Sequence, residues 1–110
     1  LSMRFLYWPN AKIVKTEGLK GRRCWLVRIR NPDGLGAYAT VDVWIDQGSG
    51  GMLKMIGYTN SGRPIRRFEV LSGKKFGDIW MVDEMRIETI HPTTGQTKSS
   101  TRMQIKATVN

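Results

Sequence analysis

The sequence contains few of the residues on which most catalytic and metal sites depend. Its 110 residues include one cysteine, Cys24, and one histidine, His91. A single cysteine excludes an internal disulfide, and one cysteine with one histidine is too few ligands for a zinc site. We expect Cys24, which precedes Trp25, to be a small buried hydrophobe, and His91, which precedes Pro92, to be a solvated turn residue. No metal and no cofactor is therefore expected.

Other catalytic patterns are missing as well. Asp83 and Glu84 are adjacent, so on a strand they point to opposite faces and cannot act as an acid and base pair. The glycines between Gly48 and Gly51 are not followed by the Lys-Ser or Lys-Thr of a phosphate-binding loop, and are typical of a hairpin turn. The sequence predicts a non-enzymatic protein.

Long apolar runs and signal-peptide features are also absent. No uncharged apolar run approaches the roughly 20 residues that span a bilayer, and no charged, apolar and small-residue succession marks a signal peptide. Apolar residues make up 40% of the chain and charged residues 25%, as in ordinary folded domains. We expect one domain over residues 1–110, with a modest core.

The apolar residues recur with the period of strands, not helices. In Ala37–Ile45 the odd positions are apolar, and the even positions include Thr40 and Asp42, with Tyr38 and Trp44 as aromatic exceptions. Similar alternation predicts one mostly dry and one mostly wet face on each strand. Residues 2–8 are ambiguous between a helical turn and an apolar arm. The predicted strands are Lys12–Thr16, Arg22–Arg30, Ala37–Asp46, Met52–Thr59, Ile65–Leu71, Ile79–Ile90 and Thr97–Val109.

Short turns rich in Gly, Pro, Asn and Ser separate these strands, and links of this length permit only antiparallel neighbours. The predicted fold is all-β: a curved antiparallel meander of about seven strands, forming an open half-barrel sheet. No long amphipathic helix is available to cover its apolar face. Closure into a barrel, a second copy, a ligand or a missing segment would have to cover it.

The order of several short motifs resembles a known family. The motifs are Trp44-Ile45-Asp46, Leu53-Lys54, Gly57-Tyr58, Arg67-Phe68-Glu69, Lys75-Phe76-Gly77-Asp78-Ile79-Trp80 and Thr94-Gly95-Gln96-Thr97. Over Cys24–Val109 this succession resembles the C-terminal half of the LolA-like outer-membrane lipoprotein-sorting proteins. The family's N-terminal half, with the helices that sit inside the curved sheet, has no counterpart here. We therefore expect the chain to be a fragment that lacks this half.

The resemblance implies a periplasmic carrier, or chaperone, whose concave apolar face accepts the acyl chains of a lipoprotein or another lipid. Residues on the dry faces are the candidate lipid contacts; the alternative for each is an ordinary core side chain. They are Val41, Val43, Met81, Met85, Ile87, Met103 and Ile105. Further expected partners are membrane-associated proteins, contacted transiently, and a second copy of the chain that buries the uncovered face or edge.

The positive charge suggests a different partner. Eighteen Lys and Arg against nine Asp and Glu give a net charge of +9, which attracts phosphates, acidic proteins and anionic membranes. The candidate docking residues are Arg22, Arg23, Arg63, Arg66 and Arg67. The alternative function is a basic β-sheet module for nucleic acid or an acidic protein, with bases stacked on Trp25, Trp44, Tyr58 and Trp80. Acidic residues interspersed among the arginines argue against nucleic acid.

Overall fold

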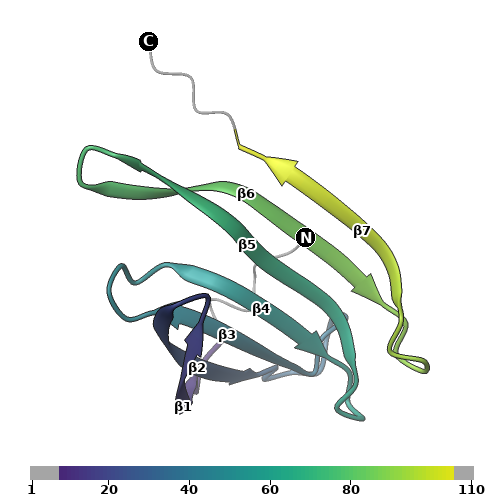
Figure 1. Cartoon of the computed structure of the whole chain (residues 1–110). Coiled ribbons are helices and arrows are strands. Elements are labelled where there is room, and N and C mark those ends of the chain that lie inside the picture. The colour runs from purple at the N-terminus through teal and green to yellow at the C-terminus, as the bar shows by residue number, and fades with distance from the viewer. Residues whose placement is uncertain (1–7, 106–110) are drawn as a thin grey trace.

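The computed structural model describes residues 8–105, which form one seven-stranded antiparallel sheet (Figure 1). The strands pair in chain order from β1 to β7, and the described residues include no helix and hence none that could cross a membrane. The strands are β1 (Lys12–Leu19), β2 (Arg22–Arg30), β3 (Thr40–Asp46), β4 (Met52–Tyr58), β5 (Pro64–Phe76), β6 (Ile79–Ile90) and β7 (Thr97–Gln104). The predicted all-β meander is confirmed.

The strand limits differ from the predicted ones mainly at one hairpin. Strands β2 and β6 have the predicted limits, whereas β5 continues past Leu71 to Phe76 and pairs there with Ile79. Strand β3 begins at Thr40 instead of Ala37, and β1 extends to Leu19. The predicted last strand ran to Val109, but its residues 106–109 lie outside the described residues, as does most of the ambiguous segment 2–8.

Turn chemistry explains the sharp hairpins. The loop between β1 and β2 has only two residues, Lys20 and Gly21, with φ of 52° and 75°. Two successive positive φ values are characteristic of the type I′ turn, whose twist matches that of the flanking strands. Gly21 adopts this conformation without strain because it has no Cβ.

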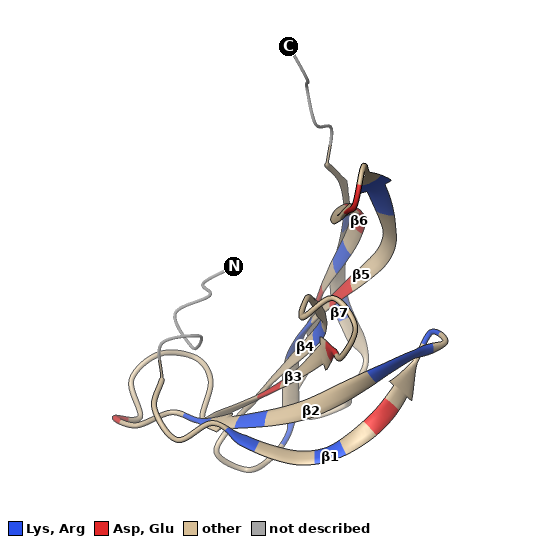
Figure 2. Ribbon diagram, turned by 90° about the vertical axis from the view of Figure 1, so that its left-hand side faces the viewer, with Lys and Arg blue, Asp and Glu red and all other residues tan. Residues whose placement is uncertain are grey.

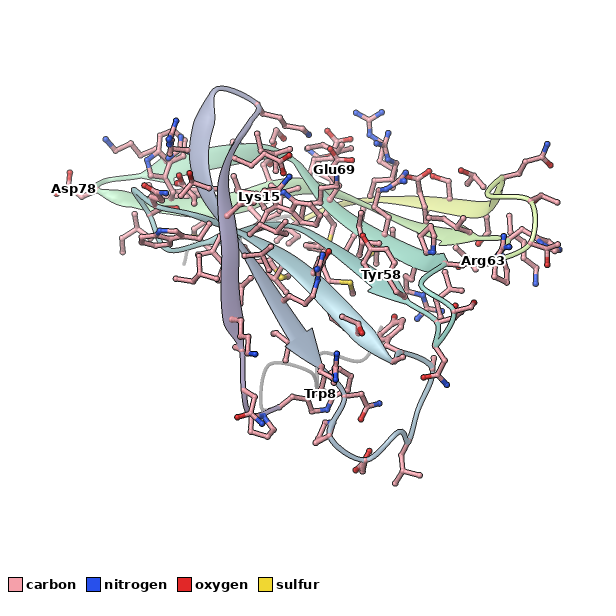
Figure 3. All side chains as sticks on the ribbon, turned by 90° about the horizontal axis from the view of Figure 1, so that it is seen from below. Trp8, Lys15, Tyr58, Arg63, Glu69 and Asp78 are labelled. Atoms are coloured by element: carbon pink, nitrogen blue, oxygen red, sulfur yellow. The ribbon has the colours of Figure 1, made fainter. Side chains whose placement is uncertain are left out.

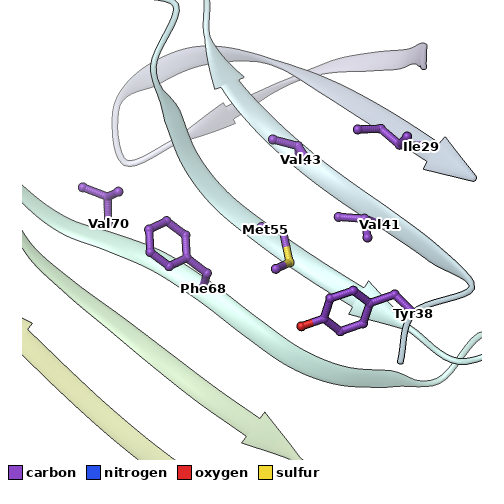
Figure 4. Packing of buried hydrophobic residues seen from close by; sticks show 7 residues of the cluster. All are labelled: Ile29, Tyr38, Val41, Val43, Met55, Phe68 and Val70. Carbon is purple, nitrogen blue, oxygen red and sulfur yellow. The ribbon is translucent and has the colours of Figure 1, made fainter. Parts of the chain in front are cut away.

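The larger core lies on one face of the sheet (Figure 4). It consists of Ile29, Tyr38, Val41, Val43, Met55, Phe68 and Val70. Val41 and Val43 alternate along β3 and pair with Gly57 and Met55 of β4, so these positions point to the same side. We refer to this side as the larger-core face.

A smaller core lies on the opposite face and consists of Cys24, Leu26, Trp44 and Ile56. Strand β3 is therefore buried on both sides, and the prediction of a wet face on every strand is wrong for it. Asp42, expected on the wet face, is only 3% exposed, and Asp46 is buried to the same extent. Cys24 is fully buried, as predicted.

The sheet is open and bends so that its first hairpin folds over the smaller-core face. Figure 2 shows the β1–β2 hairpin running at a steep angle to β5 and β6. The indole Nε1 of Trp44 donates to Glu17 Oε2 of β1 at 2.5 Å. At the hairpin tip, Lys20 Nζ donates to the carbonyl oxygen of Val70 at 3.0 Å. The first hairpin thus covers the smaller core near the β1 edge of the sheet. It does not extend to the β7 edge.

Candidate functional site

Exposed apolar side chains gather in one region of the protein. Nine large apolar residues are exposed among the described residues. Three of them lie outside this region: Ile13 and Val14 in β1, and Leu35 in the loop between β2 and β3. The remainder lie on the outer half of the β5–β6 hairpin and at the end of β7, and are 40–67% exposed. We call this set the distal apolar surface: Phe76, Ile79, Trp80, Met81, Met103 and Ile105.

The sheet topology explains why these side chains are exposed. Strand β4 pairs with β5 only as far as Glu69, and β7 pairs with β6 only from Glu84 onward. The pairing of β5 with β6 continues beyond both points, to Phe76 and Ile79. The outer part of this hairpin consequently has no neighbouring strand among the described residues on either side, and it projects from the sheet (Figure 1).

A shallow cavity of about 180 Å³ joins the hairpin to the end of β7. Its lining comprises Lys74, Phe76, Met81, Val82, Asp83, Gln104 and Ile105. The backbone amide of Ile105 donates to the carbonyl oxygen of Asp83 at 2.8 Å, which holds the end of β7 beside this cavity. Val82 also packs against the larger core, so the cavity borders this core.

The seven predicted lipid contacts lie at three levels of exposure. Val41 and Val43 are 0% and 2% exposed and belong to the larger core. Met85 and Ile87 of β6 are half-buried at its border. The remaining three, Met81, Met103 and Ile105, are exposed. Met81 and Ile105 line the cavity beside the hairpin, and Met103 pairs with Met85. Met103 therefore continues the larger-core face from Met85 to the edge strand, whereas Met81 precedes Val82 on β6 and points to the other side of the hairpin.

The sequence interpretation did not include Phe76, Ile79 and Trp80 among the candidate contacts. The signal was present in Gly77-Asp78, since a turn pair of this composition between apolar residues is typical of a two-residue hairpin loop. Extending both strands to this turn would have placed all three aromatic or aliphatic side chains at the hairpin tip.

The predicted docking arginines do not form one patch. Arg22 donates to Asp46 Oδ2 from Nε and Nη2 at 2.9 and 2.8 Å, and Arg67 lies 3.4 Å from Glu88. Arg63 donates to the carbonyl oxygens of Pro92 and Thr93, and Arg23 to the hydroxyl of Thr16. Arg66 lines a separate pocket with Lys98. Most of these arginines thus serve local structure.

Arg22 nevertheless brings positive charge to the distal apolar surface. Its guanidinium carbon lies 5.8 Å from the centroid of the Trp80 ring, and Lys75 Nζ lies 5.9 Å from it. The Asp46 carboxylate holds this arginine in place. The hydrogen bond from Arg22 is the main reason why the pKa of the Asp46 carboxyl lies well below its usual range, and the hydrogen bond from Ser49 lowers it further. A tryptophan flanked by cations is thereby presented at an exposed apolar region.

The aromatic residues proposed for base stacking do not form a common platform. Trp44 is 7% exposed within the smaller core, and Trp25 and Tyr58 are half-buried. Of the four, only Trp80 is more than half exposed, at 52%. Stacking of successive bases needs several rings open to solvent, and this arrangement does not provide them.

The residues considered for catalysis occupy structural positions. His91 is exposed at a turn and Cys24 is buried, and burial raises the pKa of the Cys24 thiol. Asp83 accepts from Ser72, while Glu84 is paired with Arg102. Within residues 8–105 no group of three or more His, Cys, Asp or Glu side chains could hold a metal ion.

One protein-family model, described as "Uncharacterized protein", matches residues 2–109. The chain belongs to that family. No curated protein matches it. Several solved structures match the chain. One is a DUF1329 family protein from Desulfovibrio piger, which has a TM-score of 0.64 and 21% sequence identity; the match covers 83% of this chain and 36% of that protein.

Two further structures carry names related to lipoprotein sorting. A putative outer membrane lipoprotein-sorting protein domain from Vibrio parahaemolyticus has a TM-score of 0.65 and 19% identity over 84% of this chain and 41% of that one. A LolA superfamily protein from Nitrosomonas europaea has a TM-score of 0.65 and 13% identity over 96% of this chain and 48% of that one. The resemblance to LolA-like proteins is confirmed for the fold. The chain spans less than half the length of each of these structures.

Proposed function

We propose that this protein is a non-enzymatic carrier that binds the acyl chains of a lipoprotein or another lipid, in the periplasm, in the sorting of outer-membrane lipoproteins. The observation that carries the proposal is that the larger-core face continues through Met85 and Ile87 of β6 to the exposed Met103 of β7, without a covering layer among the described residues. The shared fold with a protein named for lipoprotein sorting supports this choice of cargo.

In this proposal the acyl chain lies along β6 and β7 toward the hairpin tip. Met81, Met85, Ile87, Met103 and Ile105 contact it, while Val41 and Val43 form the fixed core beside this surface. Each buried methylene contributes about 0.8 kcal/mol, so a chain of ordinary length binds without any specific polar contact. Unbranched methionine side chains adapt to an irregular ligand because they have several rotatable bonds.

The cations near Trp80 add positive charge to the same hairpin. Arg22 and Lys75 lie beside the indole ring, where they can meet the anionic headgroup of a lipid or an acidic membrane-associated partner. Such a residue near an anionic membrane surface contributes about 1 kcal/mol. Tryptophan is also enriched at membrane–water interfaces, where its amphipathic ring lies at the level of the headgroups.

The direct test is native mass spectrometry of protein purified from cells without a delipidation step. We expect a population carrying additional mass that lipid extraction identifies as an acylated species. The variants Met81→Glu and Met103→Glu place a charge on the distal apolar surface and should lose most of this mass. Ile13→Glu is the control, because Ile13 is also an exposed apolar residue, at 64%, and lies on the opposite edge strand.

Two results would overturn the proposal. One is purified protein with no lipid that also binds no fatty acid or phospholipid added in detergent-free buffer. The other is equal loss of lipid in Ile13→Glu and in the distal variants, which would show nonspecific adhesion. Oligonucleotide binding that weakens steeply with salt would instead favour the basic binding-module alternative.

A further inference from the structure

A second cavity lies at the opposite end of the strands from the distal apolar surface. It is open, has a volume of about 710 Å³, and is lined by Asn10, Lys12, Val14, Arg28, Arg30, Asn31, Pro32 and Thr40. These residues come from the start of β1, the end of β2, the loop that follows it and the start of β3. Figure 2 shows the Lys and Arg segments of β1 and β2 side by side at this end.

The strand register concentrates positive charge around this cavity. Lys12 of β1 is directly opposite Arg28 of β2, and like charges in opposite positions of neighbouring strands are destabilising. Arg30 follows Arg28 by two residues, so it lies on the same face, opposite Thr40. Three cations therefore surround one cavity.

One carboxylate compensates only part of this charge. Asp42 is 3% exposed and accepts two hydrogen bonds from Arg28, with Oδ1 at 2.8 Å from Nε and Oδ2 at 3.0 Å from Nη2. Among the described residues, no carboxylate forms an ion pair with Lys12 or Arg30. The cavity thus keeps two uncompensated positive charges, and a bound anion would relieve their repulsion.

The remaining walls of the cavity are fixed and partly apolar. The Asn31 amide nitrogen donates to the carbonyl oxygens of Leu35 and Tyr38, at 2.6 and 2.7 Å, and its oxygen accepts two backbone amides of the loop. It therefore shapes the wall and is not free to bind a ligand. A shift in the β1–β2 register between Ile13 and Lys15 marks a bulge at Val14, which is 46% exposed and supplies an apolar surface.

The geometry points to a binding site for a phosphate-bearing ligand in this cavity, with Arg30 and Lys12 as its anion contacts. A guanidinium offers two parallel N–H donors that match two phosphate oxygens, and an ammonium adds a compact charge. The Thr40 hydroxyl provides a further donor at the same wall. The phosphate ester belongs either to a lipid headgroup or to a small soluble molecule. This site is separate from the acyl-chain surface and goes beyond the proposed carrier function.

The test has two arms that use different probes. In the first, inorganic phosphate is titrated into the ¹⁵N-labelled protein, and amide shifts of Lys12, Arg30 and Thr40 are followed by NMR. In the second, vesicles of phosphatidylcholine with one quarter phosphatidylglycerol are tested for binding by co-sedimentation. Lys12→Gln combined with Arg30→Gln removes the two uncompensated charges. Arg23→Gln combined with Lys98→Gln removes the same net charge from exposed positions elsewhere and is the control.

We expect the cavity variant to weaken binding in at least one arm by about tenfold or more, and the control to change it by less than about twofold. Response to phosphate alone assigns a soluble ligand, and response to vesicles assigns a headgroup. Equal weakening in both variants, or binding in neither arm by a wild-type protein with normal thermal unfolding, would overturn the site. Lipid co-purification should be unchanged in the cavity variant, so failure here is distinguishable from failure of the carrier proposal.

Discussion

Asp46 connects the end of β3 with the first hairpin and with the turn that follows it. Its carboxylate accepts from Arg22, from the hydroxyl and amide of Ser49, and from the amide of Gly48. The residue is almost fully buried, and burial of a charge is tolerated because these donors replace water. At this scale one polar side chain determines how the β1–β2 hairpin and the β3–β4 turn meet.

The first prediction concerns acid stability. Since the Asp46 pKa is lower in the folded than in the unfolded protein, its contribution to stability is fully present above the ordinary carboxyl pKa of about 4 and is lost as pH falls below it. Asp46→Asn should lower the free energy of unfolding by about 1–3 kcal/mol at pH 7. It should also make the free energy of unfolding less dependent on pH between about pH 4 and pH 2, because the titrating carboxyl is removed. Urea denaturation at several pH values measures both effects. Asp78→Asn, at the exposed turn of the β5–β6 hairpin (Figure 3), is the control.

The second prediction concerns the close contact of β4 with the larger core. A Cβ added at Gly57 would lie 2.5 Å from two ring carbons of Tyr38, which is itself buried. Gly57→Ala should therefore destabilise the protein by about 1–3 kcal/mol through displacement of this ring. In Gly18→Ala the new methyl group has no neighbouring atom within 4 Å, so the free energy of unfolding should change by no more than about 0.5 kcal/mol. Equal thermal unfolding of the two variants would contradict the packing argument.

At the scale of elements, the two hairpins differ in how they are held. The first is bound to the rest of the sheet through Trp44, Glu17 and the Lys20 contacts to Glu69 and Val70. The hydrogen bond from Trp44 also lowers the pKa of Glu17. The outer half of the β5–β6 hairpin has no paired strand on either side among the described residues, and it meets the first hairpin through Arg22, which lies over the Trp80 ring. This difference leaves the second hairpin the freer element.

The third prediction follows from that difference. Amides of Lys74–Trp80 should exchange with deuterium at least about tenfold faster than those of Phe68 and Ile87, because local opening there disrupts few packed contacts. Hydrogen exchange with mass spectrometry measures this at peptide resolution, and the β1–β2 hairpin serves as the internal comparison. Uniform protection along the whole of β5 and β6 would count against a freely projecting hairpin.

At the scale of the whole molecule, the sheet buries β3 on both sides near one edge and leaves its apolar face open near the other. Large contiguous exposed apolar surfaces mark binding sites in soluble proteins or cause association. The larger-core face ends in Met85, Ile87 and Met103 without a covering layer among the described residues. A lipid, or a second copy when lipid is missing, would bury this surface.

The fourth prediction is that lipid-free protein self-associates through the distal apolar surface. Light scattering should show an increase of mean mass with concentration, and added lipid should reverse it. Ile79→Glu should remain monomeric, whereas Leu35→Glu, at an exposed apolar residue of a distant loop, should behave as the wild type. A monomeric wild-type protein at all concentrations, free of lipid, would contradict this prediction.

Local patterns predicted much of the fold, and their failures have specific physical causes. Alternation and turn chemistry predicted the limits of β2 and β6, because each strand there ends at a clear turn signal. The continuation of β5 was missed because Ser72-Gly73-Lys74-Lys75 shows no apolar alternation, and only pairing with β6 makes it a strand. The burial of Asp42 and Asp46 was also missed, since it depends on Arg28 and Arg22 from another strand.

The antiparallel order of the sheet follows from the amino-acid sequence alone, because links this short allow no parallel neighbour. The sequence also predicts which residues of each regular strand share a face. Which apolar residues are core and which are surface becomes clear only in the folded sheet. Val41 and Met103 both lie on the apolar face, but one is covered by neighbours on all sides and the other lies on an edge strand. Burial depends on the bending of the sheet and on lateral neighbours distant in sequence, which the period of one strand does not encode.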